Sequence, residues 1–317
     1  MRIAILDDYQ RVALASADWA MLRAEVTPFH GHIADTADLV AELRPFDVVV
    51  AMRERTPFTA ERIRLLPRLR LLVTTGMWNA SIEVAAANAA GVTVCGTRGG
   101  GGSTCELTWA LILAVVRHVP EEDRRIRAGG WQQTVGFGLR GRTLGIVGLG
   151  NIGRQVAAVG RAFGMEVLAW SQHLSQGAAA EAGVTAVAKD ELFAVADVIT
   201  VHYKLSERSA GLIGERELGL MKPTAFLVNT SRGPIVDEDA LLAALHSGAI
   251  AGAGLDVYDE EPLPGGHPLR LAPRTVLTPH LGYVTDDGYR TFYTDAVEDI
   301  AAFAAGRPVR VLGTVPQ

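Results

Sequence analysis

The chain has 317 residues, of which 49% are hydrophobic and 21% are charged, and its formal net charge is −5. This length suits a large core and about two domains, whereas the acidic balance lacks the basic surface that nucleic-acid partners require. No run of about 18 uncharged apolar residues suggests a membrane span. Two cysteines, Cys95 and Cys105, and an N-terminus without a signal-peptide pattern favour the cytoplasm.

Short apolar runs alternate with helical patterns in the first ninety-odd residues, which indicates a parallel sheet with helical crossovers. We expect strands at residues 3–6, 48–51, 69–74 and 92–95, and helices at 37–43 and 82–90. A glycine-rich run at 98–103 follows, and it suits either a hinge or a surface loop.

A second β/α series starts after a long apolar helix, which is expected at residues 106–119 and to end at Pro120. Its strands are expected at residues 143–147, 166–170, 198–202, 225–229, 251–257 and 276–278, and its helices at 152–163, 239–247 and 287–305. Two such series predict two α/β units, and a small ligand is expected in the crevice between them, at the carboxyl ends of strands.

The sequence Gly148-Leu149-Gly150-Asn151-Ile152-Gly153 follows an apolar strand and opens a helix. In that context G-x-G-x-x-G is typical of dinucleotide binding, because the glycines allow a tight turn, a close approach of the pyrophosphate and close packing of helix on strand. The N–H groups at the helix start then face the phosphates. A tight turn without a ligand is the alternative.

The next strand ends at Trp170, and Ser171 stands where a carboxylate normally binds the adenosine ribose. Without that carboxylate, nothing there repels a 2′-phosphate, and no arginine attracts one. The sequence therefore predicts NAD or NADP as cofactor and leaves the preference open.

Three later segments each place a titratable side chain just after an apolar strand: Asn229–Asp237 with Arg232, Leu255–Pro262 with Glu261, and Thr278–Gly282 with His280. With the glycine turn, and in this order, they strongly resemble the D-isomer-specific 2-hydroxyacid dehydrogenase family. The resemblance covers nearly the whole chain. It implies an oxidoreductase that moves a hydride between NAD(P)(H) and a small D-2-hydroxy acid or 2-keto acid.

The resemblance also implies the roles of these three residues. His280 would be the general acid/base, and Glu261 would hydrogen-bond its other ring nitrogen and fix its tautomer. Arg232 would bind the substrate carboxylate with its planar fork of donors. No metal is expected.

Further contacts follow from the resemblance and from position after strands. Besides the glycine turn and Ser171, the expected cofactor contacts are Lys204, Thr230 and Asp256. Lys204 stands where the family often has proline, and we hypothesise that it favours a 2′-phosphate. The segment 53–56 and the loop 74–79 suggest Arg53, Thr75 and Gly76 as substrate-binding residues, with a surface charge as the alternative for Arg53.

The resemblance predicts two Rossmann-like parallel-sheet domains, with the nucleotide-binding domain (residues 99–285) inserted in the substrate-binding domain (1–98 and 286–317). The expected assembly is a homodimer. A formate dehydrogenase is disfavoured because its histidine partner is glutamine, and the regulatory domain of many phosphoglycerate dehydrogenases is not expected. A glyoxylate/hydroxypyruvate-type reductase or a broad D-2-hydroxyacid dehydrogenase is left.

Two alternatives stand beside this interpretation. Corepressors of the same fold sense the nicotinamide cofactor and retain the Arg–Glu–His set, so a binding protein is the second hypothesis. A different Rossmann enzyme, in which the histidine and glutamate are incidental, is the third. Cofactor oxidation with a panel of 2-keto acids separates the first two, and substitution of His280 tests the third.

Overall fold

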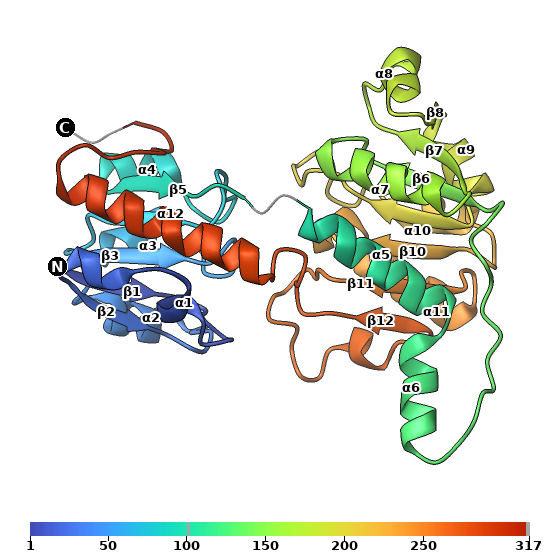
Figure 1. Cartoon of the computed structure of the whole chain (residues 1–317), viewed down its shortest axis with the longest axis horizontal. Coiled ribbons are helices and arrows are strands. Elements are labelled where there is room, and N and C mark those ends of the chain that lie inside the picture. Colours follow the sequence, from blue (N-terminus) through green and yellow to red (C-terminus); the bar gives the residue numbers. More distant parts are fainter. Residues whose placement is uncertain (100–101, 315–317) are drawn as a thin grey trace. The chain divides into compact units, whose positions relative to one another are not determined.

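The alternating strands and helices form two parallel sheets, each in its own unit of the chain (Figure 1). The computed structural model describes residues 1–99 and 102–314. Unit 1 comprises residues 1–101 and 284–317, and unit 2 comprises the residues inserted between them, 102–283. The predicted α/β class, with two parallel sheets and one unit inserted in the other, is confirmed. Gly100 and Gly101, in the expected hinge, lie outside the described residues.

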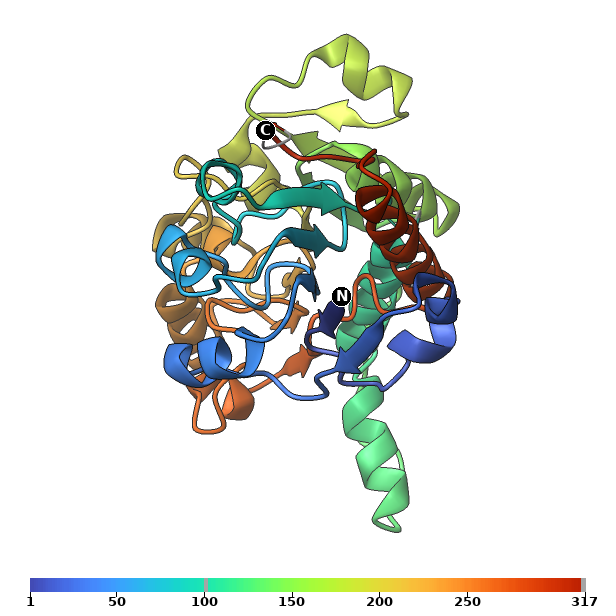
Figure 2. The same cartoon turned by 90° about the vertical axis from the view of Figure 1, so that its left-hand side faces the viewer.

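Unit 1 has a five-stranded parallel sheet in the order β2-β1-β3-β4-β5. Its central strands are continuous apolar runs because helices cover both faces of the sheet. The long helix α12 packs against α1 and β4 (Figure 2). The elements are β1 (Arg2–Ile5), α1 (Ala13–Ser16), η1 (Trp19–Leu22), β2 (Glu25–Pro28), α2 (Thr36–Leu43), β3 (Val48–Ala51), α3 (Ala60–Arg64), β4 (Leu71–Thr74), α4 (Val84–Ala89), β5 (Thr93–Gly96) and α12 (Asp286–Ala304).

Unit 2 has a seven-stranded parallel sheet in the order β12-β11-β10-β9-β6-β7-β8. Its elements are α5 (Ser103–Val116), α6 (Val119–Arg127), β6 (Thr143–Val147), α7 (Asn151–Ala162), β7 (Glu166–Trp170), α8 (Gln176–Glu181), β8 (Thr185–Ala186), α9 (Lys189–Val195), β9 (Val198–Val201), α10 (Glu215–Leu220), β10 (Phe226–Asn229), η2 (Gly233–Ile235), α11 (Glu238–Ser247), β11 (Gly252–Leu255), η3 (Pro268–Leu271) and β12 (Thr275–Leu277).

Two hydrophobic cores lie on opposite faces of this sheet, as the alternation along β10 shows. Phe226 and Val228 pack with α5 and α7, whereas Leu227 packs with residues of α9, α10 and α11. Successive side chains of a strand point to opposite faces, so a run of buried apolar residues supplies both cores. The sheet is thereby held rigid, and its carboxyl-terminal edge is fixed in position.

Three local features differ from expectation. Pro120 does not end the long helix: α5 ends at Val116, and Pro120 lies in the first turn of α6, where its missing N–H costs no helical hydrogen bond. The edge strand β2 was not predicted because it is short, partly exposed and ends in proline. The two-residue strand β8 carries too few residues to give a pattern. None of the described helices has the length and apolar character needed to cross a bilayer.

Candidate functional site

The candidate residues of unit 2 all follow the ends of strands at one edge of the seven-stranded sheet. Gly148 follows β6, Ser171 follows β7, Lys204 follows β9, and Arg232, Glu261 and His280 come after β10, β11 and β12, respectively. Because the strands are parallel, their carboxyl ends share this edge. The strand order reverses between β6 and β9, which is the position where open α/β sheets bind ligands.

The glycine turn has the geometry that a pyrophosphate requires. Gly148 has φ of +102°, and a Cβ there would lie 2.5 Å from the carbonyl oxygen of His202. A Cβ on Gly153 would lie 2.2 Å from the carbonyl oxygen of Gly148, whereas one on Gly150 would meet no atom within 4 Å. Two glycines therefore allow close backbone packing, and the third leaves open space where a phosphate would approach.

Helix α7 starts directly after this turn, and its N-cap residue, Gly150, has no side chain that could occupy the helix start. The first N–H groups of a helix have no partner within the helix, and they favour a phosphate at that end. The turn and the helix start together fit the dinucleotide that the sequence predicted.

Ser171, a predicted cofactor contact, also stabilises the glycine turn. Its hydroxyl accepts a hydrogen bond from the N–H of Leu149 at 2.9 Å, so it braces the glycine turn from the neighbouring strand end. The rings of Trp170 and Tyr203 stack, with centroids 5.9 Å apart and planes at 16°. This stack brings the loops after β7 and β9 together, and Ser171 and the exposed Lys204 follow it on the same edge.

His280 and Glu261 form a short charged contact. Nδ1 of His280 lies 2.5 Å from Oε2 of Glu261, and the imidazole is only 12% exposed. This contact fixes Nδ1 as the donor and leaves Nε2 as the ring nitrogen that can exchange a proton with a ligand. The Tyr283 ring packs edge-on against the imidazole, at 5.4 Å between centroids.

The backbone of His280 is also unusual. Its φ of +55° is a left-handed conformation that residues other than glycine rarely adopt. Such conformations persist only where surrounding contacts hold them, and they cluster at functional sites.

Asp256 supplies those contacts. Its carboxylate is fully buried and accepts bonds from the Thr278 hydroxyl (2.6 Å) and from the N–H groups of Leu281 (2.7 Å) and Gly282 (2.9 Å). Burial raises the pKa of this carboxyl, although these bonds and the nearby imidazole oppose the rise. Asp256, expected as a cofactor contact, here holds the segment that carries His280.

Arg232 lies in a loop that the end of β10 stabilises. The Asn229 side chain donates to the carbonyl of Arg232 at 2.9 Å and accepts from the N–H of Ser231 at 3.0 Å. One guanidinium nitrogen of Arg232 donates to the carbonyl of Ser231 at 2.7 Å. Thr230, another expected cofactor contact, is buried with its hydroxyl 2.8 Å from that of Thr108 on α5.

The candidates of unit 1 lie together at the carboxyl edge of its own sheet. Arg53 has φ of +50°, its N–H donates to the Thr75 hydroxyl at 2.9 Å, and its guanidinium donates to the Thr75 carbonyl at 3.3 Å. The N–H of Gly76 donates to the Thr97 hydroxyl at 2.8 Å, so a carboxylate at this amide would compete with Thr97. These contacts, with the partial burial of its side chain, argue against Arg53 as a simple surface charge.

Asn79 and Tyr258 are bracing residues that lie in segments named from the sequence but were not themselves predicted as site residues. The Asn79 side chain donates to the carbonyl of Arg53 and to the hydroxyl of Thr74. The Tyr258 N–H donates to Glu261, and its hydroxyl donates to the carbonyl of Thr278. Their positions close to strand ends were the available signal, but an amide or a phenol there is also typical of ordinary packing.

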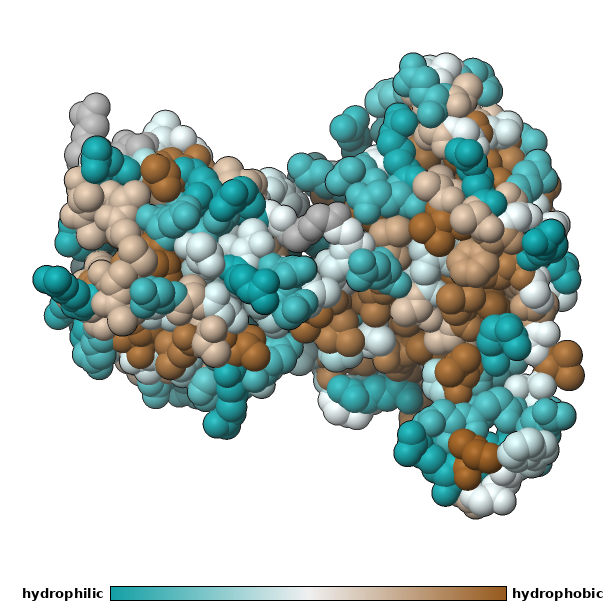
Figure 3. Space-filling model, in the orientation of Figure 1, coloured by the Kyte–Doolittle hydropathy of each residue, from teal (hydrophilic) through white to brown (hydrophobic). Residues whose placement is uncertain are grey.

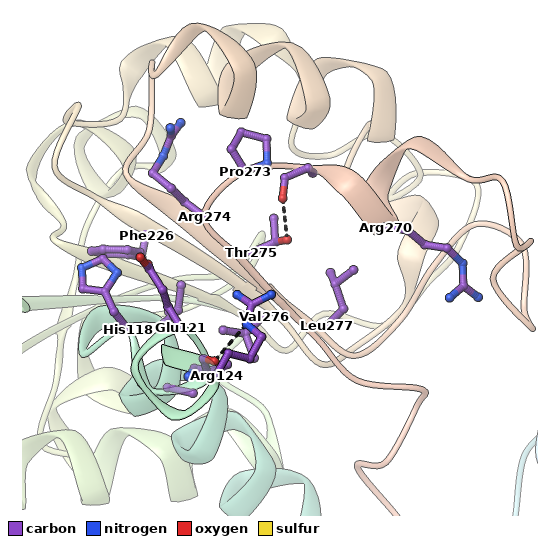
Figure 4. A pocket seen from close by; sticks show the side chains of 14 residues that line it. His118, Glu121, Arg124, Phe226, Arg270, Pro273, Arg274, Thr275, Val276 and Leu277 are labelled. Atoms are coloured by element: carbon purple, nitrogen blue, oxygen red, sulfur yellow. Dashed lines mark hydrogen bonds between the residues drawn. The ribbon is translucent and has the colours of Figure 1, made fainter. Parts of the chain in front are cut away.

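A separate hollow of about 340 Å³ lies between the α5–α6 junction and β12 (Figure 4). Phe226 and Thr275, which line it, are the first residues of their strands, so it lies away from the carboxyl edge. Its three arginines each donate to backbone carbonyls: Arg124 to Pro120, Arg270 to Pro264 and Arg274 to Ala251. These contacts give them a structural role.

Comparisons with known proteins agree with this geometry. The family model of the D-isomer-specific 2-hydroxyacid dehydrogenase NAD-binding domain matches residues 109–282. Glyoxylate reductase of Aeropyrum pernix is 41% identical over 251 residues, which are 76% of this chain and 75% of that enzyme. D-3-phosphoglycerate dehydrogenase of Archaeoglobus fulgidus is 36% identical over 88% of this chain, which spans about half (53%) of that longer enzyme.

Solved structures give the same result. The crystal structure of a phosphoglycerate oxidoreductase from Vibrio cholerae has a TM-score of 0.92 and 39% identity to this chain, and the match covers 96% of this chain and 99% of that one. A Ralstonia solanacearum protein described as a putative D-3-phosphoglycerate dehydrogenase has a TM-score of 0.93 at 34% identity, with coverage of 99% and 98%.

Proposed function

Since the chain belongs to the D-isomer-specific 2-hydroxyacid dehydrogenase family and is an NAD(P)-dependent oxidoreductase, we propose that it interconverts a small 2-keto acid and its D-2-hydroxy acid with His280 as acid/base. The observation that carries this proposal is the 2.5 Å contact between His280 and Glu261 on the edge that also bears the glycine turn. That contact orders the imidazole and leaves its other nitrogen for the substrate oxygen.

The nicotinamide, when bound, supplies or accepts the hydride. During reduction, Nε2 of His280 donates a proton to the carbonyl oxygen, and Glu261 stabilises the ring through Nδ1. During oxidation of the hydroxy acid, Nε2 accepts the hydroxyl proton. Arg232 binds the carboxylate and polarises the carbonyl next to it, which the two-pronged geometry of a guanidinium allows.

Arg53, Thr75 and Gly76 are our proposed contacts to the substrate from unit 1. Their support is the strained, braced conformation of Arg53 and the glycine turn at φ of +96° beside it. A Cβ on Gly76 would lie 2.2 Å from the Arg53 guanidinium, so only glycine leaves that side chain in place. Residues 1–98 and 286–317 would therefore form the substrate-binding domain.

The experiment is a steady-state screen of glyoxylate, hydroxypyruvate, pyruvate, phenylpyruvate and 2-ketoisocaproate with both cofactors. We expect turnover with at least one short-chain acid. We also expect a loss of at least a hundredfold in kcat for His280→Gln, the size expected when a general acid is removed. Tight NAD(H) binding without turnover of any acid would instead favour the corepressor-like protein. Full activity of His280→Gln would exclude the assigned acid/base role.

The cofactor preference depends, in our proposal, on Lys204. The exposed side chain of Lys204 lies on the edge where Ser171 replaces a carboxylate, which favours a 2′-phosphate. Lys204→Pro is expected to lower kcat/KM for NADPH several-fold relative to NADH. An unchanged ratio would refute the role of Lys204, whereas an equal fall with both cofactors would indicate a general disturbance of the loop.

We propose a homodimer that forms through α5, α6 and the segment after them. Hydrophobic side chains gather over α5 on the surface of unit 2 (Figure 3), and α6 projects from that unit in both views (Figures 1 and 2). Leu113, Val119, Ile126 and Trp131 line a hollow of about 630 Å³, and Trp131 is 71% exposed. Arg117 and Asp123 give the same hollow both signs of charge, as a self-complementary interface requires.

Light scattering tests this assembly. Ile126→Asp is expected to shift the molar mass from two chains to one, whereas Val195→Asp, an exposed valine on α9, leaves it unchanged. A wild-type protein that elutes as a single chain at micromolar concentration would refute the proposal.

We also propose a cytoplasmic location. Its support is that Cys95 and Cys105 are buried free thiols, which suit a reducing compartment. Fractionation of the source cells tests it, and recovery outside the cytoplasm would contradict it.

A further inference from the structure

Tyr258 contacts all three loops that carry Arg232, Glu261 and His280. It lies three residues after the end of β11 and three residues before Glu261, and only 7% of it is exposed. It has no place in the acid/base chemistry proposed above. Its backbone and its hydroxyl together nevertheless contact these three loops.

The first contact orients Glu261. The Tyr258 N–H donates to Oε1 of Glu261 at 3.1 Å, while Oε2 of the same carboxylate faces Nδ1 of His280. A carboxylate held at one oxygen by a backbone donor cannot rotate without losing that bond. The N–H of Tyr258 therefore restrains the orientation of the carboxylate that faces the imidazole.

The second contact joins the loop of Arg232. A Cβ built on Gly233 would lie 2.1 Å from the carbonyl carbon of Tyr258 and 2.5 Å from the N–H nitrogen of Asp259. The residue after Arg232 thus packs directly on the backbone of Tyr258. Any movement of Tyr258 is passed to the loop that carries Arg232.

The third contact reaches the segment of His280. The Tyr258 hydroxyl donates to the carbonyl of Thr278 at 3.0 Å, with the carbonyl of Leu255 at 3.3 Å. Burial, with the negative charges of Asp256 and Glu261, raises the pKa of this hydroxyl, so it remains a donor at all working pH values. Thr278 precedes the left-handed His280 by two residues, and its hydroxyl also donates to Asp256.

We propose that Tyr258 is a positioning residue for the dehydrogenase reaction. Its N–H sets the Glu261 carboxylate, its backbone supports the Arg232 loop, and its hydroxyl anchors the strained His280 segment. This proposal rests on the function proposed above, because the alignment of Arg232, Glu261 and His280 affects turnover only if these side chains act in the reaction. Tyr258 itself touches neither substrate nor cofactor in this assignment.

Tyr258→Phe tests the hydroxyl and retains the ring. We expect kcat to fall about tenfold, which corresponds to 1.4 kcal/mol in the activation barrier. The Kd for NADH, measured by fluorescence, should stay within twofold of wild type, because the glycine turn is unaffected. The midpoint of the pH–rate profile should move to lower pH, since a looser Glu261–His280 contact stabilises the imidazolium less.

Tyr289→Phe is the matched control. Tyr289 is a buried tyrosine of unit 1 whose hydroxyl donates to Gln10 at 2.9 Å, so its loss costs a similar bond and a similar fall in Tm. We expect its kcat and pH profile to match wild type. A wild-type kcat for Tyr258→Phe would overturn the proposal, and so would equal kcat losses in the two phenylalanine variants.

His280→Gln separates the two proposals. If that variant is inactive while Tyr258→Phe is fully active, the acid/base assignment stands and the positioning role of Tyr258 fails. If His280→Gln retains full activity, the proposed function itself fails.

Discussion

Replacing Glu261 by glutamine tests the central contact of the site with one atom changed. Oε1 of Glu261 accepts from the Tyr258 N–H, so the amide oxygen of glutamine must take that position. The amide NH₂ then faces Nδ1 of His280, where a carboxylate oxygen lay 2.5 Å away. A donor in that place favours the tautomer with a proton on Nε2 and opposes the imidazolium, because two donors would face each other.

The magnitude follows from the bond that is lost. A charge-assisted hydrogen bond contributes about 1.5–3 kcal/mol, and the wrong tautomer cannot accept the substrate proton at Nε2. We therefore expect kcat for hydroxy-acid oxidation to fall between about tenfold and about a hundredfold, since roughly 1.4 kcal/mol corresponds to a factor of ten. Reduction should fall comparably, because a proton donated from Nε2 comes from the imidazolium, which the amide donor also opposes. The two directions are followed by nicotinamide absorbance at fixed pH.

Glu260→Gln is the matched control for this variant, because the neighbouring carboxylate is exposed. Its kcat should equal that of wild type, and both variants should have a wild-type Kd for NADH. If Glu261→Gln retains kcat within twofold in both directions, the carboxylate does not order His280 and the reasoning fails.

Two further predictions concern the cofactor turn and the core of unit 1. Gly148→Ala should weaken NADH binding at least tenfold and destabilise the protein by about 2 kcal/mol, because its Cβ would lie 2.5 Å from the His202 carbonyl oxygen. Gly150→Ala, whose Cβ would meet no atom within 4 Å, should weaken NADH binding at an unchanged Tm. Isothermal titration measures the binding and thermal melts measure the Tm, and equal Tm values for the two variants would contradict the geometry. Burial raises the pKa of Asp299 from 3.8 to about 7, so the unfolded chain holds fewer protons between these values and the free energy of unfolding falls as pH rises from about 4 to 7. The shift corresponds to at most roughly 4 kcal/mol. Asp299→Asn should flatten this dependence in denaturant titrations, whereas Glu298→Gln should flatten it only slightly, because the charge of Glu298 is a minor cause of the shift. A slope that persists in Asp299→Asn would refute the assignment.

Local pattern alone determined much of this protein. The buried strands β3, β6 and β7 have the predicted bounds, because valine- and leucine-rich runs between turn residues have few alternatives to a parallel sheet. The glycine turn was predicted with its helix, because the spacing of the glycines depends only on the local backbone. The cofactor class and the family resemblance were likewise predicted from short motifs, and the comparisons confirm them.

Only the tertiary structure decided what the side chains after the strands contact. His280 and Glu261 are 19 residues apart, and they meet because β11 and β12 are neighbours with a fixed register. Asp256 and Ser171 are predicted cofactor contacts, and the structure adds that the first holds the His280 segment and the second braces the glycine turn. Motifs place a residue at a strand end, whereas the register and packing of neighbouring loops determine its partner, and that information is not local in the sequence.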